Sequence, residues 1–339
     1  MSAPARTLDI ASSPHIRAGV GVERIMFNVV LALLPVVAFA VYAFGLAALL
    51  GIAVATASCV LSEHLLCRLA GKPSTVGDWS VTITGLLYGL TLPPGLALWM
   101  VALGGFLGVA MAKFLFGGLG YNAFNPALVA RAFLQAAFPT AMTSWTAAFD
   151  AGRFTTLPAS VLAAPFMHPA PDAMRGATPL ARMKFEGELT SGVDLFLGLS
   201  AGSSGETCAL LILLGGLYLA ARRMLDWRIP AAILGTVALL SLACHQLDPA
   251  RYAPPGFMLS AGGLMLGAVF MATDMVASPV SRLGVLLYGA LIGTLVVVIR
   301  YWGGMPEGVM YAILLGNAVS PHLDRLIQPV AFGARGRPR

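Results

Sequence analysis

The stretch IMFNVVLALLPVVAFAVYAF, residues 25–44, decides the fold class, because its twenty residues are almost all apolar and none is charged. An α-helix rises 1.5 Å per residue, so a helix of this length spans roughly 30 Å, the thickness of a bilayer's hydrocarbon core. A signal peptide has a shorter apolar region that ends in a small-residue cleavage site. We therefore expect residues 25–44 to stay in the mature protein as a transmembrane helix.

The composition extends this interpretation to the whole chain. Hydrophobic residues make up 58% of the 339 positions and charged residues only 11%, whereas soluble domains carry about 25% charged residues. The net charge of +6 does not come from a basic run interleaved with aromatic residues, as nucleic-acid binding would require. No stretch is polar enough to form a soluble domain, so most of the surface is expected to face lipid.

We predict an all-α polytopic membrane protein with about ten transmembrane helices. The candidate spans are 25–44, 46–67, 81–95, 97–116, 125–139, 207–221, 229–246, 257–273, 284–300 and 307–321. Two of them are short: 81–95 ends at Pro93-Pro94, and 125–139 begins at Asn125-Pro126. A backbone interrupted at membrane depth is tolerated only where protein or a cavity covers it, so these breaks favour a functional site within the membrane.

A weak internal repeat relates two groups of five spans. The sequences GLLYG, residues 85–89, and GLMLG, residues 263–267, each open a short span, and each is followed by a proline-containing turn and a long apolar helix. Because five is an odd number, the second group would run in the opposite direction, which makes an inverted repeat. Gly-rich apolar helices can also resemble each other simply because small residues favour close packing.

The distribution of positive charge predicts the orientation. With the N-terminus in the cytoplasm, fifteen Lys and Arg residues lie inside and six outside, four of them on the long loop, as the positive-inside rule requires. The predicted segments are a cytoplasmic N-terminal segment 1–24, a first five-helix repeat 25–139, an external loop 140–206, a second five-helix repeat 207–321 and a cytoplasmic C-terminal tail 322–339.

Polar residues at the edges of the spans are candidates for an intramembrane site. The three candidates are Asn125, Arg131 and Asp274, because polar and ionisable groups in a membrane are costly and usually functional. Arg131 and Lys113 lie within a turn or two of the predicted cytoplasmic interface, where their long side chains can reach water. Asp274 interrupts an apolar run in TDMVASP, residues 273–279. Its carboxylate could line an ion or cofactor site, or it could cap the next turn.

The cysteines do not indicate a metal centre. Cys59, Cys67, Cys208 and Cys244 lie in or beside apolar stretches and form no C-x-x-C pair, which argues against an iron–sulfur or zinc site built by this chain alone. No glycine-rich nucleotide fingerprint follows a predicted strand, so we expect no dinucleotide site in this chain. We predict no metal site and no catalytic residue in this chain.

The predicted external loop contains the sequence DAMRGAT, residues 172–178. Taken alone, D-x-x-x-G-A-T is short enough to arise by chance. Thr178 could also simply begin a helix, with Pro179 at the first helical position. A modified hydroxyl needs an accessible backbone around it, and Gly176-Ala177 would supply one.

Together with two other motifs, this loop resembles a known family. GLGYNAFNPA, residues 118–127, precedes Arg131, the loop motif is followed by PLA at 179–181, and ATDMVASP occupies 272–279. Over nearly its whole length the chain resembles the family that contains RnfD of the Rnf electron-transport complex and NqrB of the sodium-pumping NADH:quinone reductase. Its length and its short N-terminal segment favour the Rnf branch.

The resemblance implies a covalently attached flavin. In that family a flavin transferase joins FMN through its phosphate to the threonine of a D-x-x-[ST]-G-A-[ST] motif. The matching acceptor here is Thr178, and Asp172, Gly176 and Ala177 match the recognition residues. Arg175 stands where the family usually has Ser or Thr, a departure that leaves the acceptor intact and bears on recognition by the transferase.

The same resemblance implies a set of partners and a location. The partners would be the other membrane and peripheral subunits of an Rnf complex, which carry iron–sulfur centres and flavin, and electron flow would be coupled to movement of Na⁺ or H⁺. By analogy with the sodium pump, a second, noncovalent riboflavin or FMN could lie between the spans. Both termini would be cytoplasmic and Thr178 periplasmic, in a bacterial inner membrane. Arg175, Arg182 and Lys184 could stabilise a flavin anion or its phosphate, or only keep the loop soluble.

A channel or secondary transporter without a cofactor is the main alternative, because an inverted repeat with interrupted helices would suit a small-solute or ion pore equally well. A scaffold protein would keep the spans and lack the flavin. Neither alternative needs a threonine after Gly-Ala in an external loop. We therefore expect an electron-carrying component of an ion-translocating oxidoreductase, which is not catalytic alone.

Overall fold

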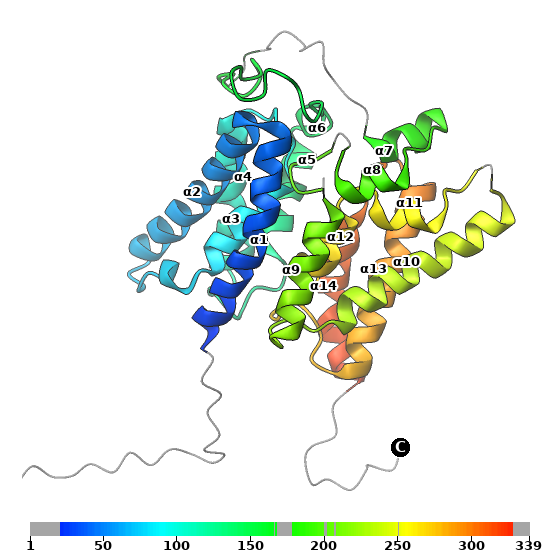
Figure 1. Ribbon diagram of the computed structural model, residues 1–339. Coiled ribbons are helices and arrows are strands. Elements are labelled where there is room, and N and C mark those ends of the chain that lie inside the picture. The colour runs from blue at the N-terminus through cyan, green and yellow to red at the C-terminus, as the bar shows by residue number, and fades with distance from the viewer. Residues whose placement is uncertain are drawn as a thin grey trace, which may run out of the picture.

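The computed structural model describes residues 21–165, 167, 178–199, 202–206, 208–249 and 251–327. Within these ranges the chain is helical and contains no β-strand. Figure 1 shows two groups of helices side by side, one from the first part of the chain and one from the second, with the connecting segments at one end. The prediction of an all-α polytopic membrane protein is confirmed.

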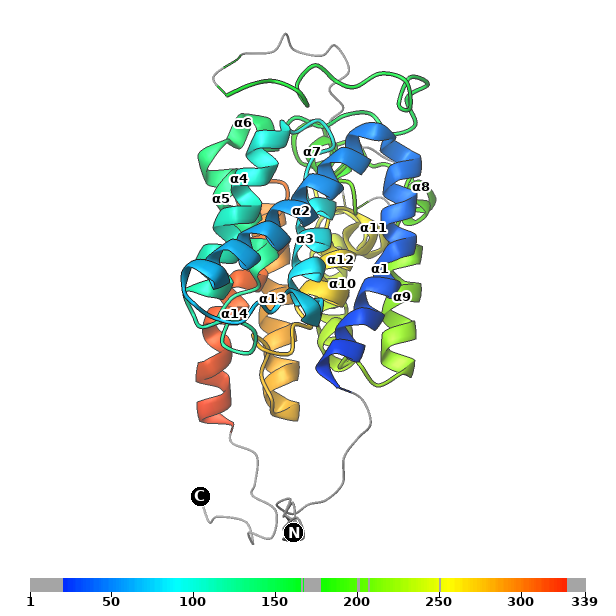
Figure 2. The ribbon, with the colours of Figure 1, turned by 90° about the vertical axis from the view of Figure 1, so that its left-hand side faces the viewer.

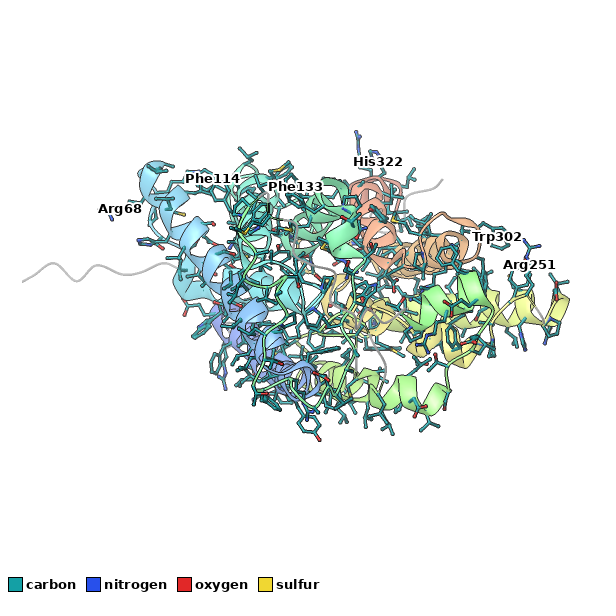
Figure 3. The ribbon with its side chains drawn as sticks, turned by 90° about the horizontal axis from the view of Figure 1, so that it is seen from above. Arg68, Phe114, Phe133, Arg251, Trp302 and His322 are labelled. Carbon is teal, nitrogen blue, oxygen red and sulfur yellow. The ribbon has the colours of Figure 1, made fainter. Side chains whose placement is uncertain are left out.

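The long apolar helices form the frame of both groups. Four helices of the described chain are long and apolar enough to cross a bilayer: α1 (Val22–Phe44), α2 (Leu46–Leu69), α10 (Arg228–Leu247) and α13 (Arg282–Trp302). Shorter apolar helices are α3 (Ser80–Leu90), α4 (Leu98–Val109), which continues as the π-helix η2 (Ala110–Phe114), and α9 (Ala209–Ala221). Seen from above in Figure 3, side chains project outward around the bundle. Leu61, Leu217 and Leu239 are largely exposed, as lipid-facing residues should be.

The remaining elements complete each group and connect the two. The first group also contains the 3₁₀ helix η1 (Val76–Asp78), α5 (Pro126–Ala137) and the short α6 (Pro139–Met142). The connecting segment holds α7 (Pro179–Ala181), the π-helix η3 (Arg182–Glu186) and α8 (Gly192–Leu197). The second group adds α11 (Pro255–Ser260), α12 (Leu264–Leu266), the π-helix η4 (Gly267–Met271) and α14 (Val309–Leu326). Each of the ten predicted spans contains one or more of these helices.

The helices are most interrupted at 257–273, where the chain forms three short helical pieces instead of the one predicted span. Between α11 and α12, Gly262 adopts a positive φ of +68°. A Cβ atom at this position would lie 1.9 Å from Oε2 of Glu307, so only glycine allows the chain to turn here and the acidic side chain to approach. The interruption therefore makes room for the carboxylate that pairs with the buried Arg300.

The two groups run in opposite directions. α4 begins at the loop end of the bundle, where the Leu98 N–H donates to the Val161 carbonyl at 3.0 Å. α13, its counterpart in the second group, ends there, because Lys184 of the connecting segment donates to the Arg300 carbonyl at 3.0 Å. The start of α1 and the end of α14 lie together at the other end of the bundle (Figures 1 and 2). This arrangement agrees with the predicted inverted repeat.

A buried cation lies near the end of α4 and of α13, at opposite ends of the bundle. Lys113 donates to Glu63 Oε2 and to Ser80 Oγ, both at 2.7 Å, and Arg300 pairs with Glu307 at 3.3 Å. The expectation that Lys113 reaches water is wrong, because its side chain is 4% exposed. The Glu63 carboxylate and the Ser80 hydroxyl supply the partners that a buried ammonium requires.

Small residues bring the helices of each group into close contact. A Cβ on Gly85 of α3 would lie 2.5 Å from the backbone of Thr56 in α2, and one on Gly108 of α4 would lie 2.5 Å from Ala130 of α5. In the second group, a Cβ on Gly293 of α13 would lie 2.8 Å from a backbone oxygen of α10. Helices in lipid associate through such close packing, because apolar surface alone gives no driving force there.

Candidate functional site

Thr178 lies at the start of α7, where it acts as the N-cap. Its side-chain oxygen accepts a hydrogen bond from the Ala181 N–H at 3.2 Å, and Pro179 occupies the first helical position. The residue is only 9% exposed. The interpretation of Thr178 as a helix start is therefore confirmed, and a role as a flavin acceptor must be compatible with it. Asp172, Arg175, Gly176 and Ala177 lie outside the described residues.

Lys184 anchors the segment that carries Thr178 to the second group of helices. Its ammonium donates to the carbonyl oxygens of Ile299 at 3.5 Å, Arg300 at 3.0 Å and Met305 at 3.0 Å, and to that of Gly303. Carbonyls at a helix C-terminus carry partial negative charge, which a cation stabilises. Partial burial lowers the pKa of Lys184. Lys184 thus binds the end of α13, and its donors are not free for a phosphate.

Thr178 lines a cavity of about 420 Å³ at the loop end of the bundle. This volume lies within the range of about 300 to 1,000 Å³ that is usual for small-molecule sites. The wall comes from both groups of helices and from the segment between them: it includes Gln135 of α5, Tyr311 of α14, Trp145 and Phe185. Three aromatic side chains and several apolar ones therefore surround the space beside the threonine.

Two ionisable side chains of this cavity form a loose pair. Arg131 of α5 and Glu206, which precedes α9, lie 3.5 Å apart, and their side chains are 10% and 8% exposed. Oε1 of Glu206 is buried without a hydrogen-bond partner. The expectation that Arg131 reaches water at the cytoplasmic interface is wrong: it is buried beside this cavity, because a carboxylate from a distant segment is there to pair with it.

Glu307 also lines the cavity, but it is fully engaged. Its carboxylate accepts hydrogen bonds from the Gly263 N–H at 3.0 Å and the Gly308 N–H at 3.1 Å, and it pairs with Arg300. The Arg300 guanidinium donates in addition to the Met258 carbonyl at 2.6 Å. Sequence reasoning missed Glu307, although a lone acidic residue in a long apolar stretch was a usable signal.

Asn125 and Asp274 both line a second, smaller cavity of about 110 Å³ at the other end of the bundle. Asp274 accepts a hydrogen bond from the Asn122 amide at 3.3 Å and from the Val276 N–H at 3.0 Å. The side-chain oxygen of Asn125 caps α5, and its amide donates to the Met271 carbonyl at 3.3 Å. Asp274 therefore both caps a turn and lines a cavity.

The structure divides the three predicted intramembrane residues between two places. Asn125 and Asp274 share the 110 Å³ cavity, whereas Arg131 lines the 420 Å³ cavity with Thr178. The sequence could not predict that these residues line two different cavities. Arg131 lies within two turns of Asn125 on the same helix, so the two residues were expected to belong to one site.

Comparison with known proteins identifies the family of the chain. The model of the NQR2, RnfD, RnfE family matches residues 9–333. The chain belongs to this family. It is 40% identical over 336 residues to the D subunit of the proton-translocating ferredoxin:NAD(+) oxidoreductase complex of Clostridium ljungdahlii, with 96% of each chain covered.

Two further relatives show a similar identity. The D subunit of the Na(+)-translocating ferredoxin:NAD(+) oxidoreductase complex of Acetobacterium woodii is 41% identical over 330 residues, which cover 96% of this chain and 95% of the relative. The D subunit of the ion-translocating oxidoreductase complex of Stutzerimonas stutzeri is 42% identical over 343 residues, with 94% of each chain covered. The family member described here thus matches these proteins over almost their whole length.

Proposed function

We propose that this chain is the RnfD component of an Rnf-type, ion-translocating oxidoreductase complex in the bacterial inner membrane, and that it carries electrons through an FMN joined to Thr178 by a phosphoester. Membership of the family and the similarity to three such proteins over 94% to 96% of the chain support the first part. The position of Thr178 in the wall of the 420 Å³ cavity supports the second part.

The residues around Thr178 fit a flavin. Trp145, Phe185 and Tyr311 offer aromatic contacts for a flat ring, and Arg131 and Glu206 offer a polar end with incompletely used hydrogen-bonding groups. When bound, FMN would supply one-electron redox chemistry, which no amino-acid side chain of this cavity supplies. The phosphoester would fix the cofactor at Thr178 and leave the ring free of covalent bonds to the protein.

The chain's own share would be to position the cofactor and exclude water. Lys184 holds the acceptor segment against α13, and the buried Leu180 packs into the core below it. Because the cavity wall combines α5, α14 and this segment, the ring would be enclosed by protein on several sides. Exclusion of water from the site would prevent side reactions of the reduced flavin. It would also strengthen the electrostatic effect of nearby charges on the ring.

We also propose that electron transfer is coupled to the movement of an ion across the membrane. The ion is Na⁺ or H⁺, because one relative is named as Na(+)-translocating and another as proton-translocating. The cavity at Asp274 suits an ion by its volume of about 110 Å³, which is well below the usual volume of a pocket for an organic ligand. This favours an ion over a second, noncovalent riboflavin or FMN at that place.

The proposed partners are the other subunits of the complex and a flavin transferase, and the proposed orientation follows the positive-inside rule. The start of α1 and the end of α14 would face the cytoplasm, and Thr178, at the opposite end of the bundle, would face the periplasm (Figure 2). A periplasmic acceptor requires a transferase that works on that side.

The decisive experiment is to co-express the chain with a flavin transferase and to run it on a denaturing gel under ultraviolet light. We expect a fluorescent band that survives denaturation, disappears in Thr178→Ala and persists in Thr178→Ser, since both hydroxyl residues can form the ester. Peptide mass spectrometry would place the adduct on the peptide with Thr178. A wild-type band without fluorescence would contradict the covalent flavin.

A further inference from the structure

Two buried arginines lie near Thr178, and their hydrogen bonding differs sharply. Arg300 is 0% exposed, and its guanidinium donates to the carbonyls of Met258 at 2.6 Å and Ala261 at 2.8 Å and pairs with Glu307, while its Nε is buried without a hydrogen-bond partner. Arg131 is 8% exposed. Within the described ranges its guanidinium donates no hydrogen bond, and it has one ion pair at 3.5 Å.

This incomplete bonding is unusual for a purely structural ion pair. Burying a guanidinium and a carboxylate is costly unless the geometry of the pair is good and the remaining donors and acceptors are satisfied. Here Oε1 of Glu206, the oxygen that lies 3.5 Å from Arg131 Nη1, is buried and accepts no hydrogen bond. Both side chains border the 420 Å³ cavity, so this weakly bonded pair belongs to the wall of a ligand-sized space.

The position of Arg131 along α5 determines which part of a ligand attached to Thr178 would contact the guanidinium. Arg131 lies six residues before Ala137, the last residue of α5, which is about 9 Å deeper in the bundle at 1.5 Å per residue. Thr178 begins α7, which lies at the loop end where α5 also ends (Figure 2). A group attached to Thr178 by its phosphate would therefore reach Arg131 with its far part, the ring.

We propose that Arg131, held in position by Glu206, is the cationic partner of the flavin ring and stabilises the negative charge that the ring carries after reduction. This inference rests on the proposed covalent FMN. A neighbouring one-electron carrier of the complex delivers one electron to the flavin, which passes it on to the next carrier. When no proton is taken up, this electron adds one negative charge to the flavin ring. The guanidinium compensates this charge without proton transfer or bond rearrangement.

The sign of the effect follows from electrostatics. A positive charge stabilises the reduced form more than the oxidised form, so it raises the midpoint potential of the flavin, and the negative charge of Glu206 lowers it. In a site shielded from water both effects are large. Removing the two charges one at a time must therefore shift the potential in opposite directions.

The test is a redox titration of the flavin-loaded complex, followed by flavin absorbance, in Arg131→Gln, Arg131→Lys and Glu206→Gln. We expect the midpoint potential to fall in Arg131→Gln by at least the equivalent of a tenfold change in the redox equilibrium, about 59 mV for one electron. It should stay near the wild-type value in Arg131→Lys and rise in Glu206→Gln. Arg182→Gln is the matched control, because Arg182 is exposed, lies four residues after Thr178 and does not line the cavity; its potential should not change.

An unchanged potential in Arg131→Gln with flavin attached overturns the inference, and it would mean that Arg131 meets only the phosphate or no cofactor group. Shifts in the same direction in Arg131→Gln and Glu206→Gln also overturn it, since a general disturbance of the cavity would cause them. If Arg131→Gln does not fold, the rise in Glu206→Gln against an unchanged Arg182→Gln decides. A wild type without covalent flavin on the gel refutes the proposed function and this inference together, whereas a fluorescent wild type with unresponsive potentials refutes the inference alone.

Discussion

The two ends of the bundle bury polar groups in different ways. At the end where α1 begins, Lys113 donates to Glu63 and Ser80, and Asp274 accepts from Asn122, so these polar groups bond to one another beside two cavities of about 110 and 220 Å³. At the loop end, the cavity is about 420 Å³, and in its wall Oε1 of Glu206 accepts no hydrogen bond and has only the 3.5 Å ion pair with Arg131. Unsatisfied buried atoms are costly and are tolerated where a ligand will use them, so the comparison favours the loop end for the cofactor.

The largest effect on stability is expected from removing the buried ion pair at the end of the bundle where α1 begins. Lys113→Met would leave the Glu63 carboxylate buried without its cation, which typically destabilises a protein by about 3 to 5 kcal/mol. We expect a marked fall in the unfolding temperature of the purified protein in detergent, together with poor expression. The control is Lys72→Met, because Lys72 is an exposed lysine near the same end. Equal unfolding temperatures for wild type and Lys113→Met would show that the polar groups at this end of the bundle do not stabilise the fold.

A smaller effect is expected from releasing the acceptor segment at the loop end. Lys184→Met removes an ammonium that donates to carbonyls at the end of α13, and a hydrogen bond to a charged group typically contributes about 1.5 to 3 kcal/mol. We expect faster tryptic cleavage after Arg182 with little change in the unfolding temperature of the helices. Arg182 is itself exposed, so cleavage at an unchanged rate would show that Lys184 does not hold the segment.

The smallest effect on stability is expected at Asp274. Asp274→Asn keeps the shape and an oxygen for the Val276 N–H, so the free energy of unfolding should change by no more than about 1 kcal/mol. The covalent flavin should also be retained, because Thr178 lies at the other end of the bundle. Ion uptake into vesicles driven by electron transfer should fall. Ion uptake at the wild-type level in this variant would contradict the proposal that the 110 Å³ cavity binds the ion.

The helices could be predicted from the sequence because lipid imposes a simple rule on every span. A stretch such as 25–44 must be helical, since a membrane offers no other partner for its backbone groups. The break near Gly262 was harder to predict: the helical pieces were predicted as one short span, and the cause of the break is the approach of Glu307, which lies 45 residues away. Contacts of this kind depend on the assembled fold.

The candidate site was predictable only in its local part. The cap at Thr178 follows from a threonine before Pro179, a pattern within one helical turn. The pair of Arg131 with Glu206 joins segments 75 residues apart, and no spacing rule predicts it. For the same reason, the sequence grouped Arg131 with Asp274, although the two residues line different cavities.

The composition of the cavity wall has a consequence for the order in which the protein is made. Thr178 and Arg131 leave the ribosome well before Tyr311 on α14, which supplies the opposite wall. Synthesis proceeds from the N-terminus, so the acceptor threonine exists for a time in a chain whose cavity is still open on one side. A chain that ends before Val309 would keep the acceptor and lose part of the enclosure, and the last helix to be inserted is the one that closes the site.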